Sequence, residues 1–256
     1  MLFRSVTHDF TWTISFNIAH NINRVTALFE GKPIPSGSFE YTIGHDLQEF
    51  YLQQWAGVNP ADGTPLWYTD GTRKTTTGDY NAAGLALNHS ADPKVYGGLS
   101  NSFAYKGFTL DVQFNYNYGN YIFDNWYNYL NSEGQTLGGF NNLSDQLHAW
   151  QKAGDKTDVP QIIIGGNNLS NSPSTRWLYN GNFIRLRNLQ FSYTFPQDMV
   201  KRTHLGNISI YIRGTNLLTM GADKRLPFDP EAGINSTANL EVLIPKTITG
   251  GIRIGL

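Results

Sequence analysis

Residues 108 to 119 read FTLDVQFNYNYG, and apolar and polar side chains alternate along the whole stretch. The apolar or aromatic positions are Phe108, Leu110, Val112, Phe114, Tyr116 and Tyr118, and the positions between them are Thr109, Asp111, Gln113, Asn115, Asn117 and Gly119. A period of two residues predicts a β-strand whose two faces meet different surroundings. A soluble sheet turns the apolar face of such a strand onto a core, whereas a membrane barrel turns it toward lipid.

The composition limits the class of protein. Charged residues make up 15% of the 256 residues and aromatic residues 14%, whereas an average soluble domain has about 25% charged residues. The mean hydropathy of -0.36 and the lack of any apolar run of about 20 residues exclude a helical membrane protein, but a barrel strand needs no such run. A formal net charge of -1 offers no basic face, so no nucleic-acid partner is predicted.

Five further stretches have the same period of two residues, and each is close to the roughly 9 to 11 residues with which a tilted strand crosses a bilayer. They are residues 10–18 (FTWTISFNI), 97–105 (GGLSNSFAY), 182–195 (NFIRLRNLQFSYTF), 207–214 (NISIYIRG) and 247–256 (TITGGIRIGL). Asn101 interrupts the apolar row of the second stretch. In the third, the apolar phase shifts by one residue between Leu186 and Leu189, which predicts a β-bulge.

The connections between these six predicted strands alternate in length. Lys106-Gly107 suits a two-residue hairpin in which glycine supplies a positive φ, and residues 196–206 form another fairly short link. Residues 19–94, 119–182 and 218–246 form long connectors. Short turns on one side and long loops on the other are typical of outer-membrane barrels, whereas most connections in a compact soluble domain have about 2 to 6 residues.

Two of the long connectors contain local structure of their own. Residues 49–71 predict a small hairpin around the turn Pro60-Ala61-Asp62-Gly63. Residues 141–154 predict a short helix that begins at Ser144 and ends at Gly154.

No catalytic residue, metal site or cofactor is predicted, so the chain is not expected to be an enzyme. It has no cysteine, no pair of histidines at helical zinc-site spacing, and no GxSxG, Walker A or GxGxxG motif. Asp229 and Glu231 are two residues apart, but sequence proximity does not establish the separation that a glycosidase pair needs. We interpret these two acids as structural.

Several motifs occur together in one order along the chain. They are AGVNPADGTPLWY, PKVYGGLSNSFAYKGFTLDVQFNYNYGN, WQKAGDKTDVPQ, RWLYNGNFIRLRNLQFSYTFP, YIRGTNLLT, DPEAG and IPKTITGGIRIGL. In this order they resemble the C-terminal part of SusC-like (RagA-type) TonB-linked outer-membrane proteins, and the resemblance spans nearly all of the chain from about Phe10 onward. It implies an all-β fold in which residues 1–256 supply about the last six strands of an antiparallel 22-stranded barrel with long extracellular loops.

The resemblance also implies a function and a set of partners. Such proteins sit in the bacterial outer membrane and import oligosaccharides or peptides, with a SusD-like surface lipoprotein as a lid and energy supplied through TonB. We expect the chain to be about a quarter of such a protein, with the signal peptide, the plug and the TonB-contacting segment outside it. Expressed alone, it is expected to aggregate, because six strands leave two edges unpaired and the smallest membrane barrel has eight.

Within this framework, two groups of residues are candidates for function. Asp111, Gln113, Asn115 and Asn117 form an amide-rich row that is predicted to face the lumen. Trp126, Tyr127, Tyr129 and Trp150 lie beyond the strand end and are predicted to contact substrate or the lid, whereas Tyr116 and Tyr118 suit the ring of aromatic residues that flanks a membrane band. The alternative that the residues leave open is a soluble, carbohydrate-binding β-sandwich module.

The orientation of residues 108–118 can be tested by placing an arginine on each face of this strand. In the full-length protein, Val112→Arg should cost about 2 to 4 kcal/mol of folding free energy if Val112 meets the middle of the bilayer, while Gln113→Arg should be much milder. The measurement is the free energy of unfolding in lipid vesicles. A spin label at Val112 that has no contact with acyl chains would contradict the membrane interpretation.

Overall fold

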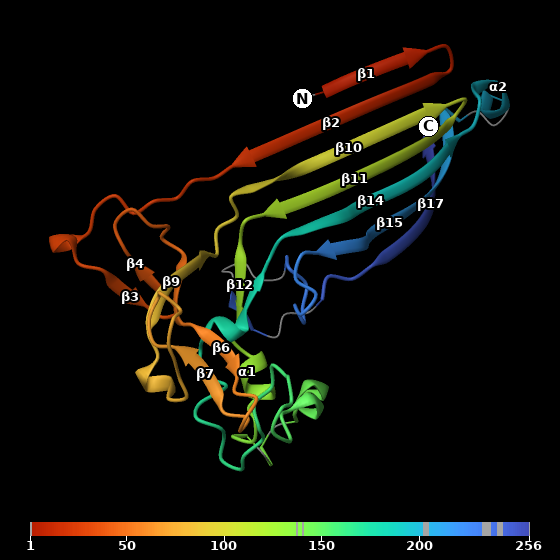
Figure 1. Cartoon of the computed structure of the whole chain (residues 1–256). Helices are drawn as coiled ribbons and strands as arrows, with labels where there is room; N and C mark the ends of the chain where they lie inside the picture. Colours follow the sequence, from red (N-terminus) through yellow and green to blue (C-terminus); the bar gives the residue numbers. More distant parts are fainter. Residues whose placement is uncertain are drawn as a thin grey trace.

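The computed structural model describes residues 2–136, 138–139, 141–201, 205–231, 237–239 and 243–255. Its largest element is one antiparallel sheet of seven strands, in the order β1-β2-β10-β11-β14-β15-β17. These strands are β1 (Leu2–Thr7), β2 (Phe10–His20), β10 (Val95–Tyr105), β11 (Phe108–Tyr118), β14 (Phe183–Thr194), β15 (Asn207–Gly221) and β17 (Thr247–Gly255). In Figure 1 the sheet is a single curved layer, and a subdomain built from the long connectors lies beyond one of its ends.

All six predicted strands are present, but the sheet has a seventh strand, β2 and β10 are each two residues longer than predicted, and β15 is seven residues longer. β1 pairs with β2 from Leu2 opposite Ser15 to Thr7 opposite Phe10. It was missed because its apolar residues do not share a face: Phe3 lies on one face, and Leu2 and Val6 lie on the other. β15 continues seven residues past Gly214, because it pairs again with β14 beyond an irregularity at Asn216, whose φ is 54°.

The predicted hairpin and the predicted bulge are both confirmed. Tyr105 pairs with Phe108, and the turn residues Lys106 and Gly107 have φ of 46° and 86°, as a two-residue turn between twisted strands requires. Arg187 is the extra residue in β14, since Gln113 faces Asn188 and Phe114 faces Leu186. Because of this extra residue, the apolar positions of β14 change from even-numbered residues, up to Leu186, to odd-numbered residues, from Leu189 onward. The apolar side chains therefore stay on one face of the sheet and the polar side chains on the other.

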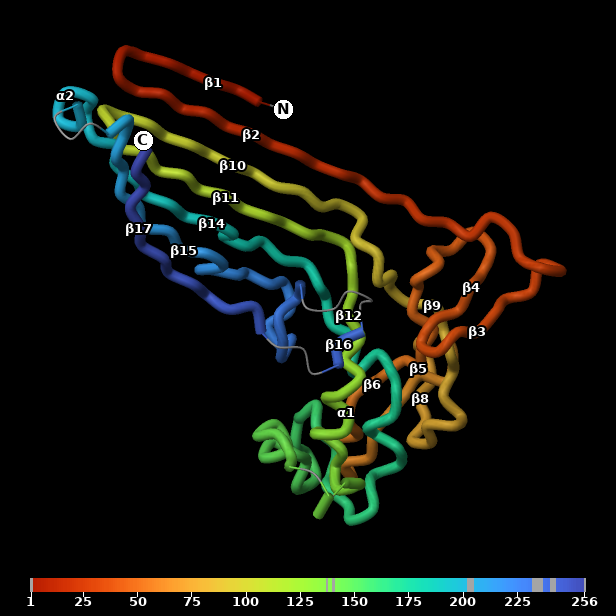
Figure 2. Tube along the Cα trace, turned by 180° about the vertical axis from the view of Figure 1, so that it is seen from behind, coloured from red at the N-terminus to blue at the C-terminus, as the bar shows by residue number. Residues whose placement is uncertain are grey.

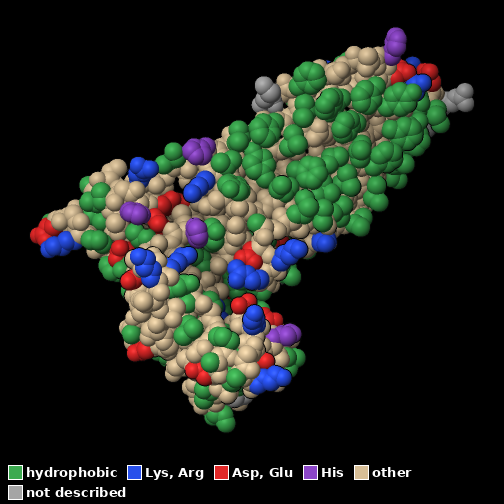
Figure 3. All heavy atoms as spheres, in the orientation of Figure 1, with side chains coloured by type: hydrophobic (Ala, Val, Ile, Leu, Met, Phe, Trp, Pro, Cys, Tyr) green, Lys and Arg blue, Asp and Glu red, His purple; other side chains and the backbone are tan. Residues whose placement is uncertain are grey.

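The register of the strands separates the sheet into an apolar face and a polar face. Residues directly opposite each other in an antiparallel sheet point to the same side. Trp12, Phe103, Leu110, Phe191 and Ile212 therefore form one row across five strands, and Phe10, Tyr105, Phe108, Tyr193 and Ile210 form another. Figure 3 shows the apolar face as a continuous hydrophobic area on the sheet, with charged side chains at its ends.

No second layer covers the apolar face in the described part of the chain. Phe16, Phe191, Ile212 and Ile252 are all exposed on it, the last at 67%. By contrast, the buried hydrophobic cluster consists of Phe50, Leu52, Ala91, Phe123, Trp177 and Leu178, which all belong to the long connectors. A β-sandwich would bury this face against another sheet, so the sandwich alternative is not favoured, whereas lipid would cover the face in a membrane.

Asn101, the polar residue that interrupts the apolar row of β10, has a partner on the same face. The Trp12 indole N–H donates a hydrogen bond of 3.2 Å to the Asn101 Oδ1 atom. The Trp12 ring also stacks on Phe103, with ring centroids 6.0 Å apart. An amide within an apolar layer is expensive unless it is hydrogen-bonded, and the indole satisfies its carbonyl oxygen.

The long connectors fold together into what we call the loop subdomain, namely the described residues of 21–94, 119–182 and 222–246. Its strands form three small sheets with the orders β3-β4-β5-β9, β6-β7-β8 and β13-β12-β16. The bounds are β3 (Ile34–Ser36), β4 (Phe39–Tyr41), β5 (Glu49–Gln53), β6 (Trp55–Val58), β7 (Pro65–Tyr68), β8 (Thr76–Thr77), β9 (Leu85–Ser90), β12 (Tyr121–Asp124), β13 (Leu178–Asn180) and β16 (Thr237–Ala238). Its α1 (Tyr127–Leu130) is a single helical turn, and α2 (Gln197–Val200) lies at the short-turn end of the large sheet (Figure 2).

The local predictions in the connectors fare differently. The hairpin is confirmed, since β6 pairs antiparallel with β7 around the Pro60–Gly63 turn. The predicted helix is only a 3-10 segment over Ser144–His148, and Ser144 is not its cap because Leu143 precedes it with no side-chain hydrogen bond. In the described residues, no helix is long and apolar enough to cross a membrane.

The bond between Trp12 and Asn101 predicts a specific pattern of stabilities. Trp12→Phe should cost about 1 to 3 kcal/mol, because it leaves the Asn101 carbonyl oxygen unpaired in the apolar layer. The double variant Trp12→Phe with Asn101→Leu should recover most of the loss, because it removes the unpaired amide. The measurement is urea unfolding in lipid vesicles, followed by circular dichroism. Equal stabilities of the single and double variants would contradict this role of the indole.

Candidate functional site

The four residues predicted to face the lumen all lie on the polar face of β11. Asp111, Gln113, Asn115 and Asn117 alternate with Val112, Phe114 and Tyr116, and the register places most of them opposite polar residues, although Asn117 lies opposite Phe183. Asn115 lies between Gly98 of β10 and Arg185 of β14, and Asp111 lies between Ser102 and Gln190. The polar face therefore collects hydrogen-bonding groups from every long strand of the sheet.

Asp111 belongs to a ladder of hydrogen bonds that crosses four strands. The Ser102 hydroxyl donates to Asp111 Oδ1 at 2.7 Å, and the Gln190 amide donates to Asp111 Oδ2 at 3.3 Å. Arg213 Nε in turn donates to Gln190 Oε1 at 2.9 Å. The one carboxylate of the predicted row is thus linked through an amide to a cation two strands away, and this part of the face is internally paired.

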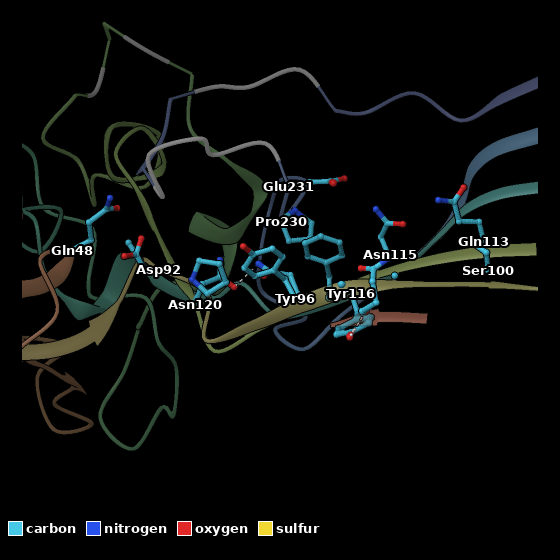
Figure 4. A pocket seen from close by; sticks show the side chains of 17 residues that line it. Gln48, Asp92, Tyr96, Ser100, Gln113, Asn115, Tyr116, Asn120, Pro230 and Glu231 are labelled. Atoms are coloured by element: carbon cyan, nitrogen blue, oxygen red, sulfur yellow. Dashed lines mark hydrogen bonds between the residues drawn. The ribbon is translucent and has the colours of Figure 1, made fainter. Parts of the chain in front are cut away.

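The other three predicted residues line a pocket of about 570 Å³ at the loop end of the polar face. Gln113, Asn115 and Asn117 form part of one wall, and Pro230 and Glu231 form the opposite wall. Figure 4 shows the side chains of Gln113 and Asn115 pointing toward the segment that carries Glu231. Asp111 is not among the residues that line this pocket, so the four predicted residues do not all belong to one site.

The segment over the pocket is held by two arginines of β14. Arg185, whose side chain is fully buried, forms ion pairs with Asp229 and with Glu231, the latter at 3.1 Å. Arg187 forms an ion pair with Glu231 and donates a hydrogen bond of 3.0 Å to Asn216 Oδ1. We call these four charged side chains, Arg185, Arg187, Asp229 and Glu231, the clamp. Its pairs join residues about 44 positions apart, so the connector after β15 is folded back onto the sheet.

The sequence did not predict the clamp. It gave Asp229 and Glu231 a structural interpretation without a partner, and it gave Arg185 and Arg187 no role. The available signal was the presence of two arginines, 185 and 187, on a strand whose polar face is otherwise neutral. Buried charges need partners, and the nearby pair of acids in DPEAG supplies them; the last two residues of that motif lie outside the described residues.

The four predicted aromatic residues do not form one site. The Trp126 and Tyr129 rings lie next to each other at α1, with centroids 5.4 Å apart, and Tyr129 is 44% exposed. Trp126 and Tyr127 line a small, mainly apolar pocket of about 230 Å³ with Leu130, Leu143 and Phe228. Tyr129 is the exposed member of this group, whereas Trp126, Tyr127 and Trp150 are half-buried.

Tyr127 and Trp150 make contacts inside the loop subdomain. The Tyr127 hydroxyl donates to Asp145 Oδ2 at 2.7 Å, and burial together with this hydrogen bond to the acid raises the pKa of Tyr127 to about 12. Tyr127 therefore stays protonated and remains a donor at any physiological pH. The Trp150 indole N–H donates to the Pro60 carbonyl oxygen at 3.1 Å, so this ring is anchored to the β6–β7 turn.

Comparison with solved structures places this geometry in a known fold. A structure of the RagAB peptide transporter matches with a TM-score of 0.85 and 29% sequence identity, covering 99% of this chain and 28% of that chain. The chain is similar to the C-terminal part of SusC-like TonB-dependent receptors. Structures of the RagAB peptide importer in the 'open-open' and 'closed-closed' states match with TM-scores of 0.85 and 0.84, each at 29% sequence identity.

Comparison with curated proteins gives the same family. TonB-dependent receptor P3 of Formosa agariphila is 27% identical over 93% of this chain and 25% of its own length. TonB-dependent receptor SusC of Bacteroides thetaiotaomicron is 23% identical over 90% of this chain and 23% of its own length. No protein-family model matches the chain. The chain spans about a quarter of the length of the curated relatives it matches, and these relatives are receptors rather than enzymes.

The clamp predicts how the connector after β15 is held. In the full-length protein, Asp229→Asn should increase the opening of residues 223–231 by about 10- to 100-fold, because it leaves the buried Arg185 charge with one partner fewer. The measurement is hydrogen–deuterium exchange of that segment. The matched control is Asp9→Asn, which breaks an exposed pair with Lys106 and should change stability by less than about 1 kcal/mol. Unchanged exchange in Asp229→Asn would show that the clamp does not hold the segment.

Proposed function

We propose that this chain is the C-terminal part of a TonB-dependent importer of the bacterial outer membrane, which takes up oligosaccharides or peptides. The observation that carries the proposal is the uncovered apolar face. The strands that form this face have the length with which a tilted strand crosses a bilayer. Aromatic rings lie at the borders of the face, namely Tyr105 and Phe108 at the short-turn end and Tyr118 at the loop end. In a membrane barrel this face meets hydrocarbon and the polar face lines the lumen.

The edges of the sheet support the proposal that residues 1–256 are one part of a larger barrel. β1 and β17 are the outermost strands, and within the described chain each pairs on one side only. Unpaired backbone groups in hydrocarbon cost several kcal/mol each, so a membrane sheet must close on itself. The remaining strands, the plug and the segment that contacts TonB would be supplied by the rest of the receptor.

The loop subdomain is the part of the chain that would meet a SusD-like surface lipoprotein and the incoming substrate. It lies on the side of the long connectors, which are extracellular in outer-membrane barrels. Its described residues include the ring pair of the half-buried Trp126 and the exposed Tyr129. Exposed aromatic side chains are common at protein interfaces and can also stack on sugar rings. Tyr127 and Trp150 would then support this surface from inside.

A gene deletion tests the proposed function. The strain that lacks the receptor should lose growth on one class of nutrient, either an oligosaccharide or a peptide, and regain it with the wild-type gene. Loss of TonB should abolish growth on the same nutrient. A receptor that fractionates with soluble proteins, or a deletion without any nutritional effect, would contradict the proposal.

The role of the Trp126 and Tyr129 rings has its own test in the same strain. The double substitution Trp126→Ala with Tyr129→Ala should reduce the growth rate on the cognate nutrient severalfold, because each lost stacking or packing contact is worth about 1 to 2 kcal/mol. Phe29→Ala is the matched control, since Phe29 is an exposed ring on another segment of the loop subdomain, at 83%. If the double variant and the control grow alike, the rings do not contact substrate or lid.

A further inference from the structure

The sheet side of the pocket at the loop end of the polar face has a gap at Gly98, between Asn17 and Asn115, which we call the notch. Gly98 lies in register between Asn17 of β2 and Asn115 of β11. A Cβ atom at Gly98 would lie 3.4 Å from Asn17 Nδ2 and 3.7 Å from Asn115 Oδ1. Because glycine has no side chain, the two amides stand on either side of an open space.

The hydrogen-bonding groups around this notch are unpaired. The side chains of Asn17, Ser100, Gln113 and Asn115 line the pocket, and none of them forms a side-chain hydrogen bond with another described residue. Farther along the same face, by contrast, Asp111 and Gln190 are paired with each other. A cluster of unpaired amides in a concave site is suited to a ligand that supplies the missing donors and acceptors.

The pocket lining contains two acids and no described base. Glu231 is paired with the two arginines of the clamp, whereas Asp92 accepts a hydrogen bond of 3.0 Å from the neutral Asn23 amide and keeps its negative charge. No lysine or arginine is among the described residues that line the pocket. An anionic ligand would find no cationic partner in this lining, and the unpaired amides favour a ligand with uncharged donors and acceptors.

An aromatic ring lies beside the amides. Tyr96 of β10 is on the polar face, lines the pocket and is 46% exposed (Figure 4). A ring next to planar amides can pack on the apolar side of a sugar ring or on a peptide unit while the amides bind hydroxyl or carbonyl groups. Both ligands present the same chemistry, that is, a flat apolar side and uncharged hydrogen-bonding edges.

We propose that this pocket is a binding subsite for one uncharged, hydrogen-bonding unit of the cargo, either a sugar ring or a peptide unit. Asn17 and Asn115 bind its polar edge across the Gly98 notch, Tyr96 packs against its flat side, and the clamp holds Pro230 and Glu231 over it. The proposal rests on the proposed import function and adds to it the place and the chemistry of recognition.

The test uses the purified full-length receptor with its partner lipoprotein, and calorimetric titration with two uncharged probes. The probes are maltohexaose and a hexapeptide of alanine and serine with both termini blocked. One of them should bind the wild-type receptor. Asn115→Leu should weaken that binding about tenfold through lost hydrogen bonds, and Gly98→Val should weaken it at least as much by filling the notch. The probe that is affected identifies the source of the ligand chemistry.

Two controls separate this proposal from folding and from import. Asn207→Leu makes the same substitution on the polar face at the opposite end of the sheet and should leave binding unchanged, and resistance to trypsin should be the same for all variants. Absence of binding of both probes to the wild-type receptor overturns the proposal, and so does equal binding by wild type, Asn115→Leu and Gly98→Val. In either case, growth that still depends on the receptor and on TonB would leave the import function intact.

Discussion

The structure depends on one constraint, which is that the backbone of the seven-stranded sheet pairs with itself while its two faces meet different surroundings. In hydrocarbon no water is available to satisfy an amide, so the strands must lie in register along their length. Register then aligns side chains of one kind across the strands, as the row from Trp12 to Ile212 shows. The same alignment places Asp111, Gln190 and Arg213 side by side on the opposite face, where they pair with each other.

The loop subdomain is stabilised by different interactions from those of the sheet. Its order comes from a small buried cluster, in which Phe50 and Phe123 come from different connectors, and from internal hydrogen bonds such as that between Tyr127 and Asp145. The third connector is tied to the sheet by the clamp, in which Asp229 and Glu231 reach the arginines of β14, and to the loop subdomain by the pairing of β16 with β12. The concave site at the loop end therefore has one wall set by the rigid sheet and the other set by ion pairs.

The sequence predicted the sheet well because lipid exposure imposes a simple local pattern. Period-two alternation identified six strands, the Lys106-Gly107 turn and the bulge near Arg187, all of which depend on neighbouring residues. β1 was not predicted, because Leu2 and Val6 lie on the face opposite Phe3 and the strand therefore has no apolar row of period two. The clamp was not predicted, because no local pattern connects Arg185 with Asp229. The four aromatic candidates were grouped because they all lie in a long connector, but Trp150 is bound to Pro60 whereas Trp126 lies beside Tyr129.

The bulge at Arg187 has a consequence for how strands of this kind can change during evolution. Inserting or deleting two residues preserves which side chains meet lipid, but a change of one residue exchanges the two faces from that point onward. The strand β14 contains one such extra residue, Arg187, and the bulge there restores the correct facing of the residues that follow. Length variation in the sheet is therefore expected in even steps, with odd steps confined to bulges, whereas the connectors can vary in length without this restriction.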